Sequence, residues 1–180
     1  MENKIIFAGS VGAGKTTAIS AVSDIMVVAT EAKASDEVAK LKSRTTVAMD
    51  YGILNLDGGG KVHLYGTPGQ DRFSFMWDIL SKGAMGIVIL IDYSRPDPLA
   101  DLEFYLNAFK KPIAQCSDAV VIGVTRTELS PDVNFLDRFH ERLCALKLNI
   151  PVFEVDGRKR EDVKQMLLAL LALLPQYQQD

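Results

Sequence analysis

Gly9-Ser10-Val11-Gly12-Ala13-Gly14-Lys15-Thr16 follows an apolar run, residues 5–8, and opens a segment with helical spacing of apolar residues. It fits the pattern G-x-x-x-x-G-K-[ST] in its required setting of strand, glycine-rich turn and helix. The glycines let backbone N–H groups point inward, and the helix adds the positive end of its dipole. We expect Lys15 to reach the β- and γ-phosphates of a nucleoside triphosphate, and the Thr16 hydroxyl to bind Mg²⁺. The predicted phosphate site consists of Gly9, Ser10, Val11, Gly12, Ala13, Gly14, Lys15, Thr16 and Thr17.

Length and composition are those of an ordinary globular domain. The chain has 180 residues, of which 48% are hydrophobic and 24% charged, so we expect one domain over residues 1–180. A formal net charge of -3 without a Lys/Arg block predicts no binding of nucleic acid. Cys116 and Cys144 lack C-x-x-C spacing, and we expect both to be buried free thiols, as in a reducing cytosol.

Membrane signals are missing from the sequence. The first apolar run is only about five residues long and leads directly into the phosphate loop, unlike a signal peptide. The longest apolar stretch near the C-terminus, residues 166–174, is far shorter than the ~20 residues of a membrane span. Glu2 and the final Gln-Tyr-Gln-Gln-Asp match neither a myristoyl nor a prenyl signal. We therefore expect a cytoplasmic protein with no direct membrane anchor.

Apolar periodicity predicts strands alternating with helices after one hairpin. A helix over about 15–28 and a polar connector, 29–44, precede the hairpin strands 47–56 and 61–65, which a glycine-rich turn joins. The remaining elements are helix 72–80, strand 86–92, a helix from Pro98, strand 119–124, a helix around 135–146, strand 151–155 and a C-terminal helix. This order predicts an α/β fold of the P-loop NTPase type. Its sheet is mostly parallel and six-stranded, with one antiparallel hairpin strand and five helices on both faces.

The loops at one edge of this sheet form the expected site, because ligands bind parallel sheets beyond the carboxyl ends of the strands. The phosphate loop and the segments after Tyr65, Asp92, Val124 and Val155 all lie at that edge. A single site accounts for all of them.

Two further motifs follow the phosphate loop. They are Thr45-Thr46-Val47-Ala48-Met49-Asp50-Tyr51 and Thr67-Pro68-Gly69-Gln70-Asp71-Arg72-Phe73. With the phosphate loop, they resemble the Ras-like small GTPases over nearly the whole chain. The likeness is closest to the bacterial branch that includes the gliding-motility polarity GTPases. The resemblance implies a protein that binds GTP or GDP with Mg²⁺, hydrolyses GTP slowly and acts as a molecular switch.

The resemblance also implies roles for residues around the γ-phosphate. Thr46 matches a threonine that binds Mg²⁺ and senses the γ-phosphate. Thr45, one position earlier, is the other candidate for this role. The alternative for both is that a β-prone threonine pair only starts a strand. Gly69 matches the glycine that hydrogen-bonds the γ-phosphate, and Gln70 the glutamine that orients the attacking water, unless it is a solvated turn residue. Arg44 is a candidate arginine finger supplied in cis, the alternative being a solvated basic residue.

Gly66 departs from the family pattern, which has an aspartate three residues before Gly69 that steers Mg²⁺ through water. The metal then relies on Thr16, Thr46, two phosphates and waters. Asp92 ends an apolar strand and is a candidate replacement for the missing carboxylate. The alternative is that Asp92 caps the turn before Pro96.

The segments for base recognition match the family less closely. Where the family has Asn-Lys-x-Asp, this chain has Thr125-Arg126-Thr127-Glu128. We expect Glu128 to accept hydrogen bonds from the guanine N1–H and N2 amine, and Arg126 to lie along the face of the base. Adenine has no adjacent pair of donors there, so a carboxylate favours GTP over ATP. The last motif resembles Val155-Asp156-Gly157-Arg158, in which we expect the Gly157 N–H to bind the guanine O6.

Four large side chains crowd the helix predicted over 72–80: Phe73, Phe75, Met76 and Trp77. One inner stripe of a short helix hides only part of such a cluster. We therefore expect one or two of them to face outward as a partner surface.

Two functions remain open. The first is a GTPase switch, for which the resemblance implies a regulator of the roadblock class that accelerates hydrolysis. The second is a non-hydrolysing scaffold with bound nucleotide, a pseudo-GTPase, which Gly66 and the altered base segment favour. Lys15, Thr16, Thr46 and Gln70 argue for the first.

Overall fold

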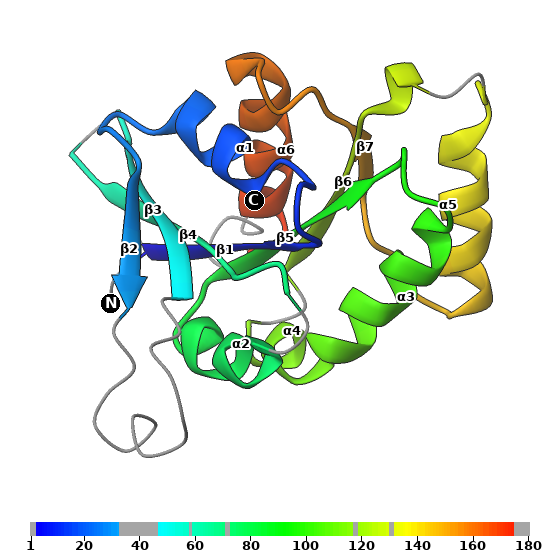
Figure 1. Cartoon of the computed structure of the whole chain (residues 1–180), viewed down its shortest axis with the longest axis horizontal. Coiled ribbons are helices and arrows are strands. Elements are labelled where there is room, and N and C mark those ends of the chain that lie inside the picture. Colours follow the sequence, from blue (N-terminus) through cyan, green and yellow to red (C-terminus); the bar gives the residue numbers. More distant parts are fainter. Residues whose placement is uncertain are drawn as a thin grey trace.

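The computed structural model describes residues 3–32, 47–57, 59–70, 73–116, 119–129 and 132–174. Seven strands within these ranges form one sheet in the order β2-β3-β4-β1-β5-β6-β7 (Figure 1). The strands are β1 (Asn3–Gly9), β2 (Val28–Ala32), β3 (Val47–Asn55), β4 (Lys61–Gly66), β5 (Gly86–Asp92), β6 (Val120–Thr125) and β7 (Val152–Glu154).

Strand direction brings five loops to one edge of the sheet. β3 pairs antiparallel with both β2 and β4, whereas β4, β1, β5, β6 and β7 pair parallel with one another in sheet order. The carboxyl ends of parallel strands meet at the same edge. The phosphate loop after β1 therefore lies beside the segments that follow β4, β5, β6 and β7.

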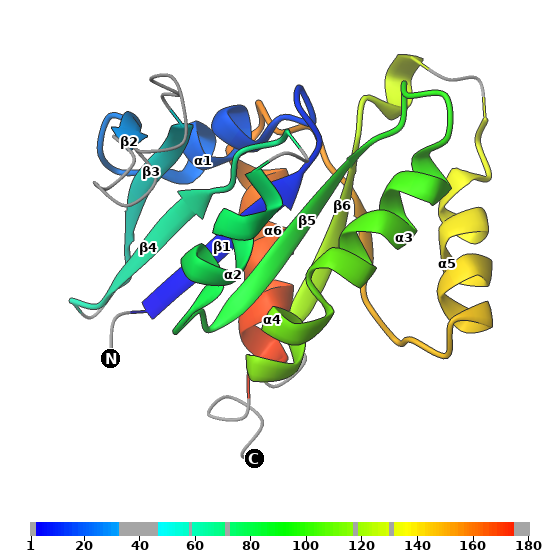
Figure 2. The same ribbon diagram turned by 60° about the horizontal axis from the view of Figure 1, so that its bottom comes forward.

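Helices cover both faces of the sheet. α1 (Lys15–Val22) and α6 (Arg160–Ala172) lie on one face (Figures 1 and 2). The helices on the opposite face are α2 (Ser74–Ser81), α3 (Pro98–Ala108), α4 (Lys110–Gln115) and α5 (Phe135–Ala145). A short 3-10 helix, η2 (Thr127–Leu129), follows β6. The predicted fold class, a mostly parallel sheet between two layers of helices, is confirmed.

Each face of the sheet has its own apolar core. Under α1 and α6, the buried side chains include Phe7, Ile19, Val22, Leu64, Val88, Met166 and Leu170. On the opposite face they include Ile6, Trp77, Ile89, Leu102, Tyr105, Phe109, Phe139 and Leu143. All seven residues of β5 are buried, which is why this strand has a continuous apolar sequence.

The stretch after the phosphate loop differs from the prediction. α1 ends at Val22 rather than near residue 28, and β2 occupies part of the predicted connector, which makes seven strands instead of six. Ser23 ends the helix, because its hydroxyl oxygen accepts the Ile53 N–H of β3 at 3.1 Å. The next N–H, of Asp24, binds the Ile53 carbonyl at 2.7 Å. These bonds join the end of α1 to β3. The sequence of β2, which follows, has no hydrophobic alternation that predicts a strand.

A sixth helix, α4, is the second difference from the prediction. The sequence from Pro98 was expected to form one helix, but α3 ends at Ala108 and α4 begins at Lys110. Pro112 explains the break. Its ring has no N–H to donate to Ala108, four residues earlier, and clashes with that carbonyl in a continuous helix.

The two cysteines differ in exposure. Both are free thiols, but Cys116 is buried and Cys144 is exposed. The expectation of burial is therefore wrong for Cys144. α5 buries Phe135, Phe139 and Leu143, so the next position along the helix turns away from the core.

The C-terminal helix packs one face on the sheet. α6 buries Val163, Met166, Leu167 and Leu170, and its first turn is acidic. Acidic side chains there suit the positive end of the helix dipole. None of the helices in the described part of the chain is both long enough and apolar enough to cross a membrane.

Candidate functional site

The backbone of the phosphate loop requires glycine at Gly9, Gly12 and Gly14. Gly12 and Gly14 have φ of 82° and 96°, in the region that disfavours side chains, and Gly14 caps the start of α1. Gly9 has φ of 143°, and a Cβ there would lie 2.3 Å from the Leu90 carbonyl oxygen of β5. The loop thus lies tightly against β5.

Lys15 begins α1 and folds back over the loop. Its ammonium donates to the carbonyls of Gly9 and Ser10, both at 2.7 Å, and only 8% of the residue is exposed. Burial lowers the pKa of Lys15 from 10.5 to about 8, and the nearby Asp50 carboxylate offsets part of that effect. A buried cation at the start of a helix is suited to bind an anion.

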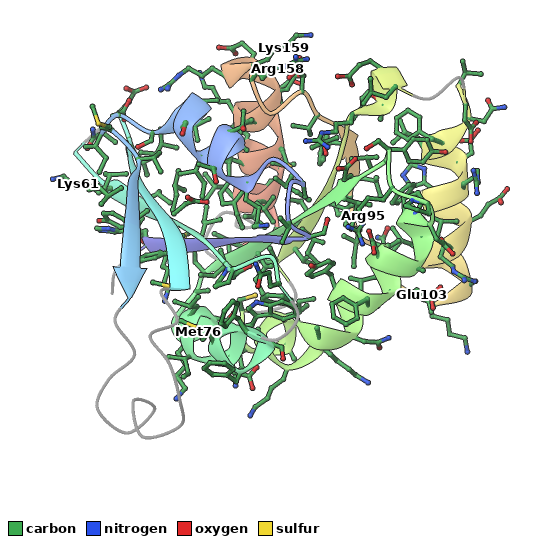
Figure 3. The ribbon with its side chains drawn as sticks, in the orientation of Figure 1. Lys61, Met76, Arg95, Glu103, Arg158 and Lys159 are labelled. Atoms are coloured by element: carbon green, nitrogen blue, oxygen red, sulfur yellow. The ribbon has the colours of Figure 1, made fainter. Side chains whose placement is uncertain are left out.

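Gly69 packs directly on the phosphate loop. A Cβ at this position would lie 2.6 Å from the Val11 nitrogen and 2.8 Å from the Lys15 ammonium. Gln70 follows with its side chain exposed, and both residues border a cavity of about 400 Å³. The other lining residues are Ser10, Val11, Arg95, Ala100, Asp101, Phe104 and Tyr105. Arg95, labelled in Figure 3, forms an ion pair with Asp101 at 2.5 Å. The residues predicted to meet the γ-phosphate thus adjoin Lys15.

Trp77 fixes this segment to the core. Its indole N–H donates to the Pro68 carbonyl at 3.0 Å, and its ring is stacked on Phe109 with centroids 5.2 Å apart. The tryptophan is 1% exposed. Pro68 directly precedes Gly69, which packs on the phosphate loop. The buried Trp77 of α2 therefore fixes the position of the backbone next to that loop.

A second cavity, of about 220 Å³, brings together the segments predicted to recognise the base. It lies next to the phosphate loop at the carboxyl ends of β6 and β7. Its lining residues are Ala13, Gly14, Thr17, Thr125, Arg126, Glu128, Val155, Asp156, Gly157 and Arg158. The first of these stretches, residues 13–17, lies more than 100 residues before the other two, so their meeting depends on the sheet order. Both cavities border the phosphate loop, the first through Ser10 and Val11 and the second through Ala13 and Gly14.

Thr125 and Arg126 connect β6 to the phosphate loop. The Thr125 hydroxyl lies 3.1 Å from the Ala13 carbonyl, a contact that the sequence did not predict. Arg126 has φ of 59° and its guanidinium binds the buried carboxylate of Asp92 at 2.8 Å. Asp92 also accepts from the Ser94 N–H and hydroxyl. Asp92 therefore caps the turn that follows β5, as its alternative interpretation held, and it also forms an ion pair with Arg126.

Charged side chains surround the mouth of the base-side cavity. Arg158 binds Asp156 through its Nε at 2.7 Å and lies 3.5 Å from Glu128 (Figure 3 labels Arg158 before α6). Hydrogen bonds from Arg158 lower the pKa of Asp156 to about 2. Gly157 backs onto α1, since a Cβ there would lie 3.6 Å from the Ala18 nitrogen. Glu128 therefore borders this cavity and is paired with a cation.

Asp50 is a site residue that the sequence did not reveal. It lies on β3 opposite Gly66 of β4, and its Oδ2 accepts the Thr16 hydroxyl at 2.6 Å. The pairing follows from the hairpin register: counting residues away from the turn on both strands places Asp50 opposite Gly66. That register was the sequence signal from which the contact could have been predicted. A hydroxyl and a carboxylate side by side are oxygen ligands of the kind that Mg²⁺ prefers. The donor set at the start of α1 therefore fits the metal of a Mg²⁺-nucleotide.

Several predicted features lie outside the described residues: Arg44, Thr45, Thr46 and Arg72. The aromatic cluster of α2 is described, and it divides as expected. Phe75 is 56% exposed, whereas Trp77 is buried. Met76, labelled on α2 in Figure 3, is half-buried.

Residues 24–176 match a family described as conserved hypothetical ATP binding proteins. The chain belongs to this family. An uncharacterized protein of Methanocaldococcus jannaschii is also similar to this chain, with 33% identity over 150 residues, 81% of this chain and 88% of that protein. The family match begins after residues 9–16, so the phosphate loop is an independent indication of nucleotide binding.

Ras-related proteins are also similar to this chain. The Ras-related protein SEC4 of Candida albicans is 25% identical over 134 residues, 72% of this chain and 62% of that protein. SEC4 of Saccharomyces cerevisiae is 23% identical over 133 residues, 72% and 60% of the two chains. The chain thus spans less than two thirds of these relatives. Among solved structures, the G domain of the T. maritima FeoB iron transporter aligns with a TM-score of 0.60 at 19% identity, over 99% of this chain and 100% of that one. The fold is that of a P-loop G domain.

Proposed function

We propose that the chain binds GTP and GDP with Mg²⁺, hydrolyses GTP slowly and acts as a nucleotide-controlled switch. The main support is the meeting of the phosphate loop, Gly69 and the base-side cavity along one edge of the sheet. The phosphates would bind the loop N–H groups and Lys15, and Mg²⁺ would bind Thr16. The metal supplies charge that stabilises the transferring phosphoryl group.

Residues on the γ-phosphate side support hydrolysis. Gly69 would donate its N–H to the γ-phosphate, and Gln70 would orient a water in the adjoining cavity. Lys15 would balance the charge that develops on the phosphate oxygens. Thr46 as a Mg²⁺ ligand and Arg44 as a cis arginine remain proposals from the family resemblance.

Guanine rather than adenine is the proposed base. Glu128 borders the base-side cavity, and a carboxylate accepts the two adjacent donors of guanine. Arg126, Asp156, Gly157 and Arg158 complete that wall. The second candidate is ATP, which the description of the matched family favours. Competition of unlabelled GTP and ATP against a fluorescent nucleotide distinguishes them. Displacement by ATP at equal concentration contradicts the guanine assignment.

Phosphate release tests the enzymatic part of the proposal. We expect purified protein with Mg²⁺ to turn over GTP slowly, and Gln70→Leu to bind GTP normally but nearly stop turnover. An exposed control, Asn107→Leu on α3, should keep the wild-type rate. Intact bound GTP in both wild type and Gln70→Leu would instead support the non-hydrolysing scaffold.

Gly69→Ala is expected to lower affinity for GTP about 10-fold or more relative to GDP. The new Cβ would meet backbone atoms of Val11 and Ser10 at 2.6 and 2.8 Å, so the segment must move off the phosphate loop. The N–H contact with the γ-phosphate is then lost, and GDP has no such contact. The measurement is displacement of fluorescent GDP by GTP and by GDP. Gly60→Ala is the matched control, because its Cβ meets only Leu56 at an ordinary 3.5 Å. Equal loss of both nucleotides would contradict the prediction.

A partner surface next to the switch is part of the proposal. Phe75 and Ile79 of α2 are 56% and 62% exposed, on the helix that follows Gln70. From the resemblance to the bacterial polarity GTPases, the proposed partner is a regulator of the roadblock class that accelerates hydrolysis. We further propose a single domain over residues 1–180, a cytoplasmic location and no nucleic-acid partner.

A further inference from the structure

The carboxylate of Asp50 occupies the space left by Gly66. A Cβ added at Gly66 would lie 3.0 Å from the Cβ and 3.0 Å from the Oδ2 of Asp50. The same Oδ2 accepts the Thr16 hydroxyl at 2.6 Å. A side chain at position 66 would therefore project toward the point that the Asp50 carboxylate already reaches from the neighbouring strand.

Sheet register explains how β3 takes this role. Asp50 is the direct cross-strand partner of Gly66 in the β3–β4 ladder, so their side-chain positions share one face of the sheet. Gly66 leaves room for the carboxylate to extend over β4 toward the start of α1. A larger residue at position 66 would push Asp50 away from Thr16.

The position suits a hard divalent cation. Two neighbouring oxygen ligands of an octahedral Mg²⁺, each at about 2.1 Å, lie about 3 Å apart. Thr16 Oγ1 and Asp50 Oδ2 are 2.6 Å apart. If these two oxygens moved apart by a few tenths of an ångström, both could bind an ion that lies between them and the phosphates. The charge of Asp50 also raises the pKa of the Lys15 ammonium at the start of α1. Asp92, the other acidic candidate, is already bound by Arg126 and Ser94.

We propose that Asp50 is the carboxylate through which the protein holds the Mg²⁺ of the bound nucleotide, in place of the aspartate missing at Gly66. This inference rests on the proposed function, since the ion arrives with a nucleotide. The missing aspartate therefore does not mark a metal-free pseudo-GTPase. The carboxylate has moved from β4 to the adjacent strand.

The test measures how Mg²⁺ slows the dissociation of fluorescent GDP and fluorescent ADP at free Mg²⁺ from micromolar to millimolar. In wild type, Mg²⁺ should slow release strongly, and EDTA should reverse the effect. Asp50→Asn keeps the size of the side chain and a hydrogen-bond acceptor for Thr16 but removes the charge. We expect it to need at least about 10-fold more Mg²⁺ for half of the maximal effect.

A carboxylate swap provides the matched rescue. Asp50→Ala empties the space beside Thr16, and Gly66→Asp in the same chain supplies a carboxylate from β4. We expect Asp50→Ala/Gly66→Asp to recover Mg²⁺ dependence to within a few-fold of wild type, whereas Asp50→Ala alone loses it. Asp57→Asn, in the exposed hairpin turn, should behave as wild type. Thermal unfolding of each variant without nucleotide shows whether it is folded.

The outcomes separate the two proposals. If wild type binds neither nucleotide, the proposed function fails before Asp50 is tested. If wild type shows Mg²⁺-dependent release and folded Asp50→Asn keeps that dependence unchanged, Asp50 has only a structural bond to Thr16 and the inference is wrong. The inference also fails if the folded double variant recovers nothing.

Discussion

Lys15→Met is expected to weaken nucleotide binding at least about 100-fold while making the nucleotide-free protein more stable at pH 7. Removing one partner of a desolvated charge pair costs about 2–5 kcal/mol of binding, and each 1.4 kcal/mol is about 10-fold in affinity. Within the described part of the chain, however, the Lys15 residue is 8% exposed and its ammonium donates to two neutral carbonyls, those of Gly9 and Ser10. Methionine fills similar space without a charge to bury.

The effect on stability depends on pH in a defined direction. Folding lowers the pKa of Lys15 from 10.5 to about 8. Below pH 8 this difference lowers the free energy of unfolding of the wild type by about 3 kcal/mol. Lost hydrogen bonds to Gly9 and Ser10 offset about 2 kcal/mol, which leaves a gain of about 1 kcal/mol for the variant. Between pH 8 and 10.5 the unfolded wild type binds more protons than the folded one, so wild-type stability rises and the advantage of Lys15→Met disappears.

Urea unfolding at several pH values, with fluorescent-nucleotide titration, measures both effects. Wild-type affinity should fall as pH rises above 8, because empty Lys15 loses its proton there and phosphate-bound Lys15 retains it. Lys15→Met should show no such fall. The control is Lys61→Met, an exposed position on β4 that Figure 3 labels away from the phosphate loop. A variant that is less stable than wild type at pH 7, or that binds normally, contradicts this account.

Trp77→Ala should be the most destabilising single substitution among those considered. The side chain is 1% exposed and contacts Tyr105 and Phe109 with ring centroids 5.5 and 5.2 Å away. Truncating such a residue costs about 3–5 kcal/mol, a large part of the 5–15 kcal/mol of a typical domain. The Pro68 carbonyl, which accepts the indole N–H at 3.0 Å, also loses its donor.

Two further variants separate packing from the hydrogen bond. Trp77→Phe keeps an aromatic ring in the core but removes the N–H, so we expect a loss of about 1–3 kcal/mol from the unpaired Pro68 carbonyl. Phe75→Ala on the same helix is 56% exposed and should change stability by only about 0.5 kcal/mol. Urea unfolding followed by circular dichroism compares all three, since two of them lack the single tryptophan. Equal losses for Trp77→Phe and Trp77→Ala would assign the whole effect to the hydrogen bond, against this prediction.

Local sequence signals were sufficient where one segment determines its own structure. The phosphate loop, the hairpin and the buried run of β5 were predicted because glycine spacing and apolar periodicity reflect short-range geometry. β2 was missed because its strand character comes from pairing with β3, and α4 because one proline divides a continuous apolar pattern. The predicted roles of Thr46 and Arg44 are not tested by the described residues.

The sequence by itself determined the class of fold, the glycine-rich loop at residues 9–16 and the identity of the segments that follow each strand. Only the tertiary structure decided which side chains meet: Asp50 with Thr16, Thr125 with the phosphate loop, and Arg126 with Asp92. Those contacts depend on strand order and register, which bring residues more than 30 positions apart within 3.1 Å. Periodicity along the chain specifies which face a side chain takes, but its partner across the sheet is specified only when the strands pair.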